Sequence, residues 1–292
     1  MTQTPGTSMR ANFHGAWALG GSFRTHYRQT PMNPFATHGL PSWAEYMALD
    51  ANAAVAYYSN LFGWHAEAMP MGDDTYHVMQ AGPFSAAGIM AVPEPGMPPC
   101  WGFYITVEDV DSTAATAAAA GAQVIVPVTD APGVGRFCGF LDPQGAYLAA
   151  MSYDEPTADD PPRTMETAFQ TPGMFSWLEC RVPDVDKAIA FYTELFGWTI
   201  QTQDMSGTPY SMLQVGDVTI GGVMQQPFEG APPHWGGYVT VRDTDQTLET
   251  AATTGGKISV PAFDVPGVGR LGFLEDPQGA SLAVAAYQEP AT

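Results

Sequence analysis

Basic residues are scarce in this sequence, which has 10 Lys and Arg against 30 Asp and Glu and a formal net charge of −20. A surface of this sign repels the phosphate backbone of nucleic acids, and no cluster of Lys and Arg is present to attract an anionic membrane. We therefore expect neither nucleic acid nor a membrane as a partner. The charge favours neutral or cationic ligands over polyanions.

Cysteines and long apolar runs are also few. Cys100, Cys138 and Cys180 are odd in number and lie far apart, which is no disulfide framework and fits a reducing compartment. No apolar run approaches the roughly 20 residues that a membrane-spanning helix needs. The apolar stretch 16–19 is too short for a secretory signal. These absences predict a soluble, cytoplasmic protein.

One pattern occurs twice in the chain. Residues 56–64, A-Y-Y-S-N-L-F-G-W, return as residues 190–198, A-F-Y-T-E-L-F-G-W, at an offset of 134 residues. The register holds without a gap over 43–153 and 177–287, with roughly two in five aligned positions identical, so the chain contains a duplication. We expect an N-terminal arm at 1–40, a first domain at 41–153, a Pro-rich linker at 154–174 and a second domain at 175–288. The arm either lies on the body through Phe13, Trp17, Phe23 and Tyr27 or is a flexible tail.

Both copies predict the same order of elements. In the second copy the pattern predicts helices at 184–196 and 245–253. Strands are expected at 177–182, 198–203, 210–215, 218–224, 235–241, 257–261, 270–274 and 280–286. Each copy is thus strand-helix-strand-strand-strand performed twice. The predicted fold class is α+β, with four βαβββ units that pair into two half-open barrels, here called cups.

Alternation along the strands indicates which side chains enter the cups. In the strand that starts at Trp177, the apolar Leu178, Cys180 and Val182 suit the face covered by a helix, so the other set faces the cup. The residues predicted to face the cups are Trp43, Glu45, Met47, Tyr104 and Thr106 in the first copy and Trp177, Glu179, Arg181, Tyr238 and Thr240 in the second.

The pattern D-x-x-x-A-x-x-F-Y-x-x-x-F-G-W at 184–198 and the Asp-Pro-Gln-Gly turn at 276–279 resemble the vicinal oxygen chelate superfamily. That superfamily includes glyoxalase I, extradiol dioxygenases, fosfomycin-resistance enzymes and bleomycin-binding proteins. The resemblance covers nearly all of 43–287, twice, and is greatest to two-domain glyoxalase-like proteins. It implies the half-open barrel fold and leaves function open, since the superfamily includes both enzymes and binding proteins.

The resemblance also implies where a divalent metal would be held: early in the first strand, at the start of the fifth and in the last strand of a copy. Those positions are Trp43, Gly102 and Ala149 in the first copy and Trp177, Gly236 and Ala283 in the second. None of these side chains can ligate such a cation. We therefore expect no metal site of the family type and no cofactor.

Glu45 and Glu179 are the candidate catalytic residues, because a carboxylate in an aromatic cavity is tuned toward a general base. The alternative is that each is paired with a neighbouring Arg, for which Arg136 and Arg270 are the natural candidates, or caps backbone amides. Arg136 and Arg270 each follow Pro-Gly-Val-Gly and are candidate ligand-binding residues. Their alternative is an ion pair with Asp130 or Asp264 that closes a loop.

Aromatic side chains supply the remaining candidates for ligand binding. Trp43 and Trp177 stand at the lost metal position, where a flat ring can stack on a ligand or simply fill the cup. Tyr104 and Tyr238 are predicted beside them, together with Tyr76 and Tyr210. Trp64 and Trp198, at the junction of helix and strand, are predicted to be core.

Three functions remain open at this point. The leading one is a small-molecule-binding protein that either sequesters a ligand or uses Glu45 or Glu179 as base in a metal-independent lyase or isomerase step. The second is a metal-dependent glyoxalase-like or dioxygenase-like enzyme with Glu45, Glu179, His77 and His234 as non-standard ligands. The third is a structural or signalling protein. Whether the chain is an enzyme stays open, as does its state as monomer or homodimer, since a copy can close a cup alone or exchange halves.

Overall fold

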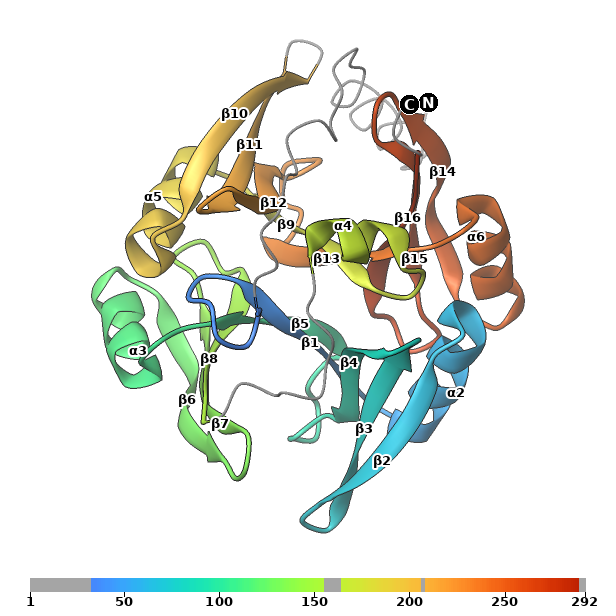
Figure 1. The fold of residues 1–292 in the computed structure, drawn as a ribbon, viewed down its shortest axis with the longest axis horizontal. Helices are drawn as coiled ribbons and strands as arrows, with labels where there is room; N and C mark the ends of the chain where they lie inside the picture. The colour runs from blue at the N-terminus through green and yellow to red at the C-terminus, as the bar shows by residue number, and fades with distance from the viewer. Residues whose placement is uncertain (1–32, 155–163, 206–207, 289–292) are drawn as a thin grey trace.

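The computed structural model of the chain describes residues 33–154, 164–205 and 208–288, and there the two copies form two eight-stranded sheets (Figure 1). The order in the first is β2-β3-β4-β1-β5-β8-β7-β6 and in the second β10-β11-β12-β9-β13-β16-β15-β14. Each copy closes its own sheet, and the α+β fold of tandem βαβββ units is confirmed.

The first sheet comprises β1 (Pro41–Ala48), β2 (His65–Met71), β3 (Asp74–Ala81), β4 (Phe84–Ala91), β5 (Cys100–Thr106), β6 (Gln123–Ala131), β7 (Gly135–Leu141) and β8 (Tyr147–Tyr153). The second comprises β9 (Phe175–Val182), β10 (Thr199–Met205), β11 (Thr208–Val215), β12 (Val218–Gln225), β13 (His234–Thr240), β14 (Lys257–Val265), β15 (Gly269–Glu275) and β16 (Ser281–Tyr287). The helices are α2 (Ala51–Phe62), α3 (Val110–Ala119), α4 (Met165–Gln170), α5 (Val185–Phe196) and α6 (Thr244–Thr253).

The repeated helix begins and ends where the sequence predicts. In α5 the carboxylate of Asp184 accepts a hydrogen bond from the Lys187 amide at 3.1 Å, which satisfies one of the free donors of the first turn. The helix ends at Gly197, whose φ of 68° lies in the left-handed region that glycine tolerates. Helix α2 repeats this arrangement with Asp50 and Gly63.

The two family-like motifs of one copy bind those of the other. The hydroxyl of Tyr58 in α2 donates to Asp276 in the turn of the second copy at 3.0 Å. The side chain of Gln278 in the same turn exchanges two hydrogen bonds of 2.8 Å with the backbone of Asp50. The second copy returns the same bonds, from Tyr192 to Asp142 at 2.9 Å and between Gln144 and Asp184 at 2.8 Å. Helix α2 also lies beside α6, and α3 beside α5 (Figure 1).

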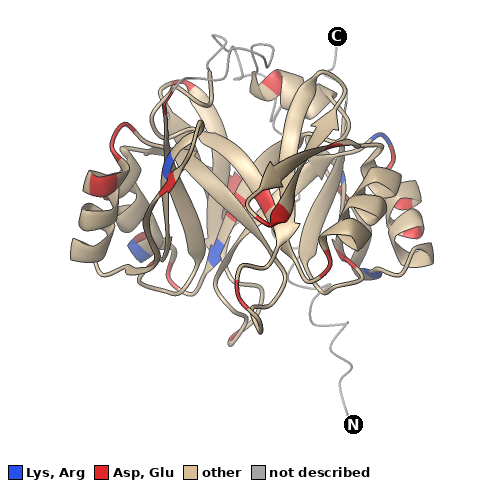
Figure 2. Ribbon diagram, turned by 90° about the horizontal axis from the view of Figure 1, so that it is seen from below, with Lys and Arg blue, Asp and Glu red and all other residues tan. Residues whose placement is uncertain are grey.

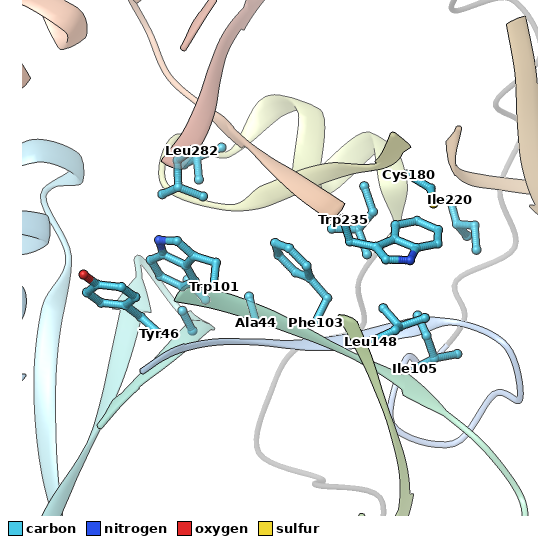
Figure 3. Close-up of a cluster of buried hydrophobic side chains, with 14 of the residues drawn as sticks. Ala44, Tyr46, Trp101, Phe103, Ile105, Leu148, Cys180, Ile220, Trp235 and Leu282 are labelled. Atoms are coloured by element: carbon cyan, nitrogen blue, oxygen red, sulfur yellow. The ribbon is translucent and has the colours of Figure 1, made fainter. Parts of the chain in front are cut away.

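Behind the cups, the two sheets pack against each other in one apolar core (Figure 3). Trp101 and Phe103 of β5 lie 5.2 and 5.7 Å from the ring of Phe175 at the start of β9. The sequence analysis predicted that helices cover this apolar face of each sheet. That prediction is wrong for the middle of the face, which is covered by the other sheet. Trp64 and Trp198 are buried as predicted, and each donates its indole N–H to a backbone carbonyl next to the other copy's first strand, Gly173 and Gly39.

The duplication begins earlier than the sequence comparison indicates. Phe35 and Phe169 occupy equivalent places, with ring contacts to Tyr153 at 5.1 Å and Tyr287 at 4.6 Å. Phe35 belongs to the segment predicted as an arm, and Phe169 lies in α4, inside the segment predicted as a linker. Short segments on both sides of the predicted boundaries therefore pack onto the cups. The rest of the arm, with Phe13, Trp17, Phe23 and Tyr27, lies outside the described residues.

Acidic residues are spread over helices, strands and loops, with few basic residues among them (Figure 2). Across the described ranges, no helix is long and apolar enough to cross a membrane.

Candidate functional site: two unequal cups

The first cup is built around the carboxylate of Glu45 in the middle of β1. Tyr104 of β5 donates its hydroxyl to Oε1 of Glu45 at 2.8 Å, and Tyr76 of β3 donates to Oε2 at 3.0 Å. The indole N–H of Trp43 donates to the Tyr76 hydroxyl at 2.7 Å. The predicted residues Trp43, Glu45 and Tyr104 thus come together. Each carboxylate oxygen accepts one hydrogen bond from tyrosine and keeps a lone pair for another partner.

Glu45 differs from an ordinary surface glutamate in its acidity. Burial in the aromatic cup raises its pKa, against the opposing effect of the hydrogen bonds from Tyr104 and Tyr76. Within the described part of the chain, Glu45 has no ion pair with a basic side chain. Trp43, Glu45 and Tyr76 are nevertheless only half-buried, so solvent reaches the cup. A carboxylate with a raised pKa and an open side is suited to receive a proton.

Two further residues shape this cup, and the sequence prediction missed both. Gly88 of β4 faces Glu45 in the parallel pairing of β1 and β4, and a Cβ atom there would overlap the Tyr76 hydroxyl. Its glycine is therefore required for the hydrogen bond to Glu45, and Gly222 plays the same part beside Tyr210. The signal was available, since both copies keep this glycine in a strand interior. Tyr147 of β8 lies close enough for the charge of Glu45 to raise its pKa, after the larger effect of burial.

The second cup repeats the same hydrogen bonds. Tyr238 donates to Oε1 of Glu179 at 2.9 Å, Tyr210 donates to Oε2 at 3.0 Å, and the Trp177 indole donates to Tyr210 at 3.0 Å. This cup is closed, however: Glu179 has 0% of its surface exposed and Trp177 has 6%. Glu179 does have an Arg partner, but it is Arg181 rather than Arg270: Arg181 forms an ion pair with Glu179 at 2.5 Å.

The family positions for a metal come together in the cups without a ligand atom. In the first sheet Gly102 pairs with Glu45, Trp43 with Tyr104, and Tyr104 with Ala149, so all three positions surround the carboxylate. Their indole, hydrogen and methyl side chains do not fit a divalent cation.

The non-standard ligand set does not converge either. Glu45 and Glu179 belong to different sheets, and His77 pairs with Ile89 on the face of β3 opposite to Tyr76. Over the described ranges, no three His, Cys, Asp or Glu side chains lie together in an arrangement that could hold a metal ion.

Arg136 and Arg270 do not face the cups, so the geometry gives no support to their predicted role in binding a ligand there. Arg136 precedes Phe137, whose ring packs on Tyr104 inside the cup, so by alternation Arg136 lies on the outer face of β7. There it forms ion pairs with Asp130 and Asp111. Arg270 is bound in the same way by Asp264 and Asp245. The alternative of an Asp–Arg pair at the loop therefore describes both.

A cavity of about 120 Å³ lies between the copies, at the beginnings of β1 and β9 and next to α4. Trp43, Trp177, Phe103 and Phe175 are among its mainly apolar lining residues. Neither Glu45 nor Glu179 lines it. No acid–base side chain is among its described lining residues.

The arrangement of the sheets and the architecture of the cups are those of a known family. Residues 42–149 and 174–284 match the model of the Glyoxalase/Bleomycin resistance protein/Dioxygenase superfamily. The chain belongs to this superfamily. Its relatives include a protein called putative glyoxylase CFP32 from Mycobacterium tuberculosis, 33% identical over 267 residues, with 89% of this chain and 96% of the relative covered. Another is the anthracycline biosynthesis protein DnrV from Streptomyces peucetius, 28% identical, with 86% of this chain and 94% of the relative covered.

Solved structures share the fold at low sequence identity. The Mn(II)-bound glyoxalase from Novosphingobium aromaticivorans has a TM-score of 0.55 at 14% identity, with 87% of this chain and 86% of that one covered. The 2,3-dioxygenase LapB from Pseudomonas sp. KL28 has a TM-score of 0.57 at 12% identity, with 88% and 95% covered. These likenesses concern the fold alone.

Proposed function

We propose that this protein binds a small, uncharged and partly aromatic organic molecule in the first cup, and that Glu45 removes a proton from it without a metal ion. The observation that carries the proposal is the half-buried Glu45 carboxylate, oriented by Tyr76 and Tyr104 and not neutralised by a described cation. The reaction type is an isomerase-like or lyase-like step that begins with proton abstraction next to a carbonyl group.

The lining of the cup supports this class of ligand. Trp43, Tyr104 and Phe137 present aromatic surface, and Tyr147 has no hydrogen bond to a described residue. Its hydroxyl can therefore donate to a ligand oxygen on which negative charge develops when the proton leaves. The net charge of −20 disfavours an anionic ligand.

The names of two relatives, though not of the putative glyoxylase CFP32, are consistent with an aromatic, carbonyl-bearing molecule. DnrV and DauV are called anthracycline biosynthesis proteins, and anthracyclines are planar fused-ring compounds with carbonyl groups. The proposal takes from them only the ligand class, a flat ring system with a ketone.

The test uses tetralone, a neutral aromatic ketone, in deuterated buffer with chelator-treated protein. We expect the protein to accelerate exchange of the hydrogen next to the carbonyl for deuterium, because Glu45 takes that proton and returns a solvent deuteron. Glu45→Gln should lower the exchange rate by about a hundredfold or more. Glu179→Gln is the matched control and should leave the rate unchanged.

Three other results have definite meanings. Binding of tetralone at the first cup without exchange would replace catalysis by sequestration. Loss of exchange on chelation, restored by Zn²⁺ or Mn²⁺, would overturn the metal-independent step. Absence of both binding and exchange would reject the proposal.

A further inference from the structure

The two cups share one carboxylate network but differ beside it. At the offset of 134 residues, Met47 corresponds to Arg181, and Cys100 corresponds to His234. Both pairs lie next to the carboxylate, since Met47 pairs with Cys100 across β1 and β5, and Arg181 pairs with His234 across β9 and β13. These two cross-strand neighbours are thus one of the differences between the cups.

Arg181 is fixed from several sides. Its Nη2 atom lies 2.8 Å from the Tyr238 hydroxyl and 2.5 Å from Oε1 of Glu179. Its guanidinium carbon lies 5.0 Å from the centre of the Phe273 ring, which is a cation–π contact. The first copy has Gly139 at the place of Phe273, and there the ring of Tyr147, whose counterpart in the second copy is Ser281, lies over the glycine instead.

His234 completes the attachment. Its Nδ1 atom lies 2.9 Å from the carbonyl oxygen of Pro232, which can only accept, so Nδ1 carries the hydrogen. The other ring nitrogen then accepts from Nη1 of Arg181 at 3.3 Å. Burial and the positive charge of Arg181 lower the pKa of His234, which keeps this acceptor neutral. The cation is thus bound by a carboxylate, a tyrosine, a histidine and a phenyl ring.

We propose that Arg181 acts as a built-in occupant of the second cup and decides that only the first cup takes the ligand. The guanidinium neutralises Glu179 and fills the side of the cup that Met47 leaves apolar in the first copy. Arg181 itself is 6% exposed, against 9% for Met47, while Glu179 is fully covered and Glu45 is not. The second cup is thereby a latent site for the same uncharged aromatic class, and this inference rests on the proposed function.

One N–H group of Arg181 lacks a hydrogen-bond partner in the described part of the chain, which is consistent with a cup whose polar groups do not fully match a guanidinium. Its Nε atom is buried and has no hydrogen-bond partner among the described residues. Buried N–H groups without a partner are rare in native proteins. A guanidinium that had a fully matched structural site would have this donor satisfied as well.

The test counts binding sites by equilibrium dialysis with naphthol, a neutral aromatic probe. We expect one site per chain in the wild-type protein and two in Arg181→Met. Met47→Arg should abolish binding, and the double exchange of Met47→Arg with Arg181→Met should restore one site, now sensitive to Tyr238→Phe rather than to Tyr104→Phe. If Arg181→Met alone does not fold, the binding sites are counted in the double variant Arg181→Met/Glu179→Gln, in which the carboxylate that Arg181 neutralises is replaced as well.

The results separate the two proposals. Suppose that the wild-type protein has one site, that Met47→Arg abolishes it, and that Arg181→Met still has a single site, alone or combined with Glu179→Gln. This result would overturn the role of Arg181 and leave the proposed function standing. Two wild-type sites would also overturn it. No wild-type binding to naphthol or tetralone would reject the proposed function and the inference that rests on it.

Discussion

At the residue scale, the behaviour of Glu45 depends on the side chain two positions further along β1. Met47 leaves the carboxylate without a counter-ion among the described residues, whereas Arg181 in the second copy supplies one. The free-energy cost of ionising the carboxylate therefore differs between the two cups. A buried carboxylate alone has its ionised form disfavoured, while a paired one is held by charge and hydrogen bonds together.

The first prediction concerns the stability of the protein as a function of pH. An unfolded Glu45 releases its proton near its ordinary pKa of 4.5, but the folded protein retains that proton to higher pH. Glu45 therefore costs no stability below pH 4.5 and an increasing amount as the pH rises from 4.5 toward the raised pKa. In urea titrations, the free energy of unfolding of Glu45→Gln should decline less over this range than that of the wild-type protein.

Glu94→Gln is the control for this prediction, since it removes an exposed carboxylate of the same copy. Parallel curves for the wild type and Glu45→Gln would contradict the raised pKa of Glu45.

Most of the carboxylate site could be predicted from the sequence at this scale, because strand alternation alone places Trp43, Glu45 and Tyr104 on one face. The same rule, applied to Phe137, would have placed Arg136 outside the cup. The Pro-Gly-Val-Gly loop before Arg136 led to a ligand-binding role being predicted instead, whereas the structure places this side chain on the outer face of β7. The closure of the second cup could not be predicted, because it depends on the cross-strand register of Arg181 and His234.

At the scale of the elements, the repeated helix is a connector as well as a core element. The hydroxyl of Tyr58 accepts from the Trp101 indole at 3.1 Å and donates to Asp276 of the other copy at 3.0 Å. Oδ1 of Asp276 also accepts from three backbone amides of its own turn, so both oxygens of this buried carboxylate have hydrogen-bond donors. The sequence predicted the helix and the turn. The pairing of Tyr58 with Asp276 spans 218 residues, so local sequence patterns do not predict which tyrosine binds which turn.

The second prediction removes this hydroxyl. Tyr58→Phe leaves the Trp101 N–H without its partner and one oxygen of Asp276 without its donor, so the free energy of unfolding should fall by about 1–3 kcal/mol. Tyr192→Phe should cost a similar amount, since it breaks the equivalent bonds to Trp235 and Asp142. Urea denaturation followed by tryptophan fluorescence measures both.

Tyr57→Phe is the matched control, because the neighbouring Tyr57 hydroxyl is buried without a hydrogen-bond partner among the described residues. A loss for Tyr57→Phe equal to that for Tyr58→Phe would show that the bond to Asp276 contributes nothing.

At the scale of the whole molecule, the copies form one structural unit with two separate cups. The backs of the sheets share a core (Figure 3), and hydrogen bonds join both pairs of motifs across the copies. Neither copy can be removed without exposing Trp101, Phe103 or Trp235 of the other to water. The duplication was predicted from the sequence, but the face that joins the copies was not. An apolar strand face has the same sequence pattern whether a helix or another sheet covers it.

The third prediction follows for thermal unfolding. Calorimetry and far-UV circular dichroism should show one coincident transition, because neither copy has a complete core alone. Tyr58→Phe in the first copy and Tyr192→Phe in the second should each move the entire transition down, by roughly 2–4 °C per kcal/mol lost. Two resolved transitions, or a variant that shifts only half of the unfolding enthalpy, would show that the copies fold independently.

The crossed bonding between α2 and the turn at Asp276 has a consequence for synthesis on the ribosome. The helix that carries Tyr58 emerges 218 residues before its acceptor. At about 5–20 residues per second, the first copy waits roughly 10–40 s for that turn. During this time its sheet can form, but until β9 has been made the back of β5 has no cover, and Trp101 and Phe103 are open to water or to a chaperone. The half of the protein that is made first is therefore the half that depends on the last turn of the chain to finish folding.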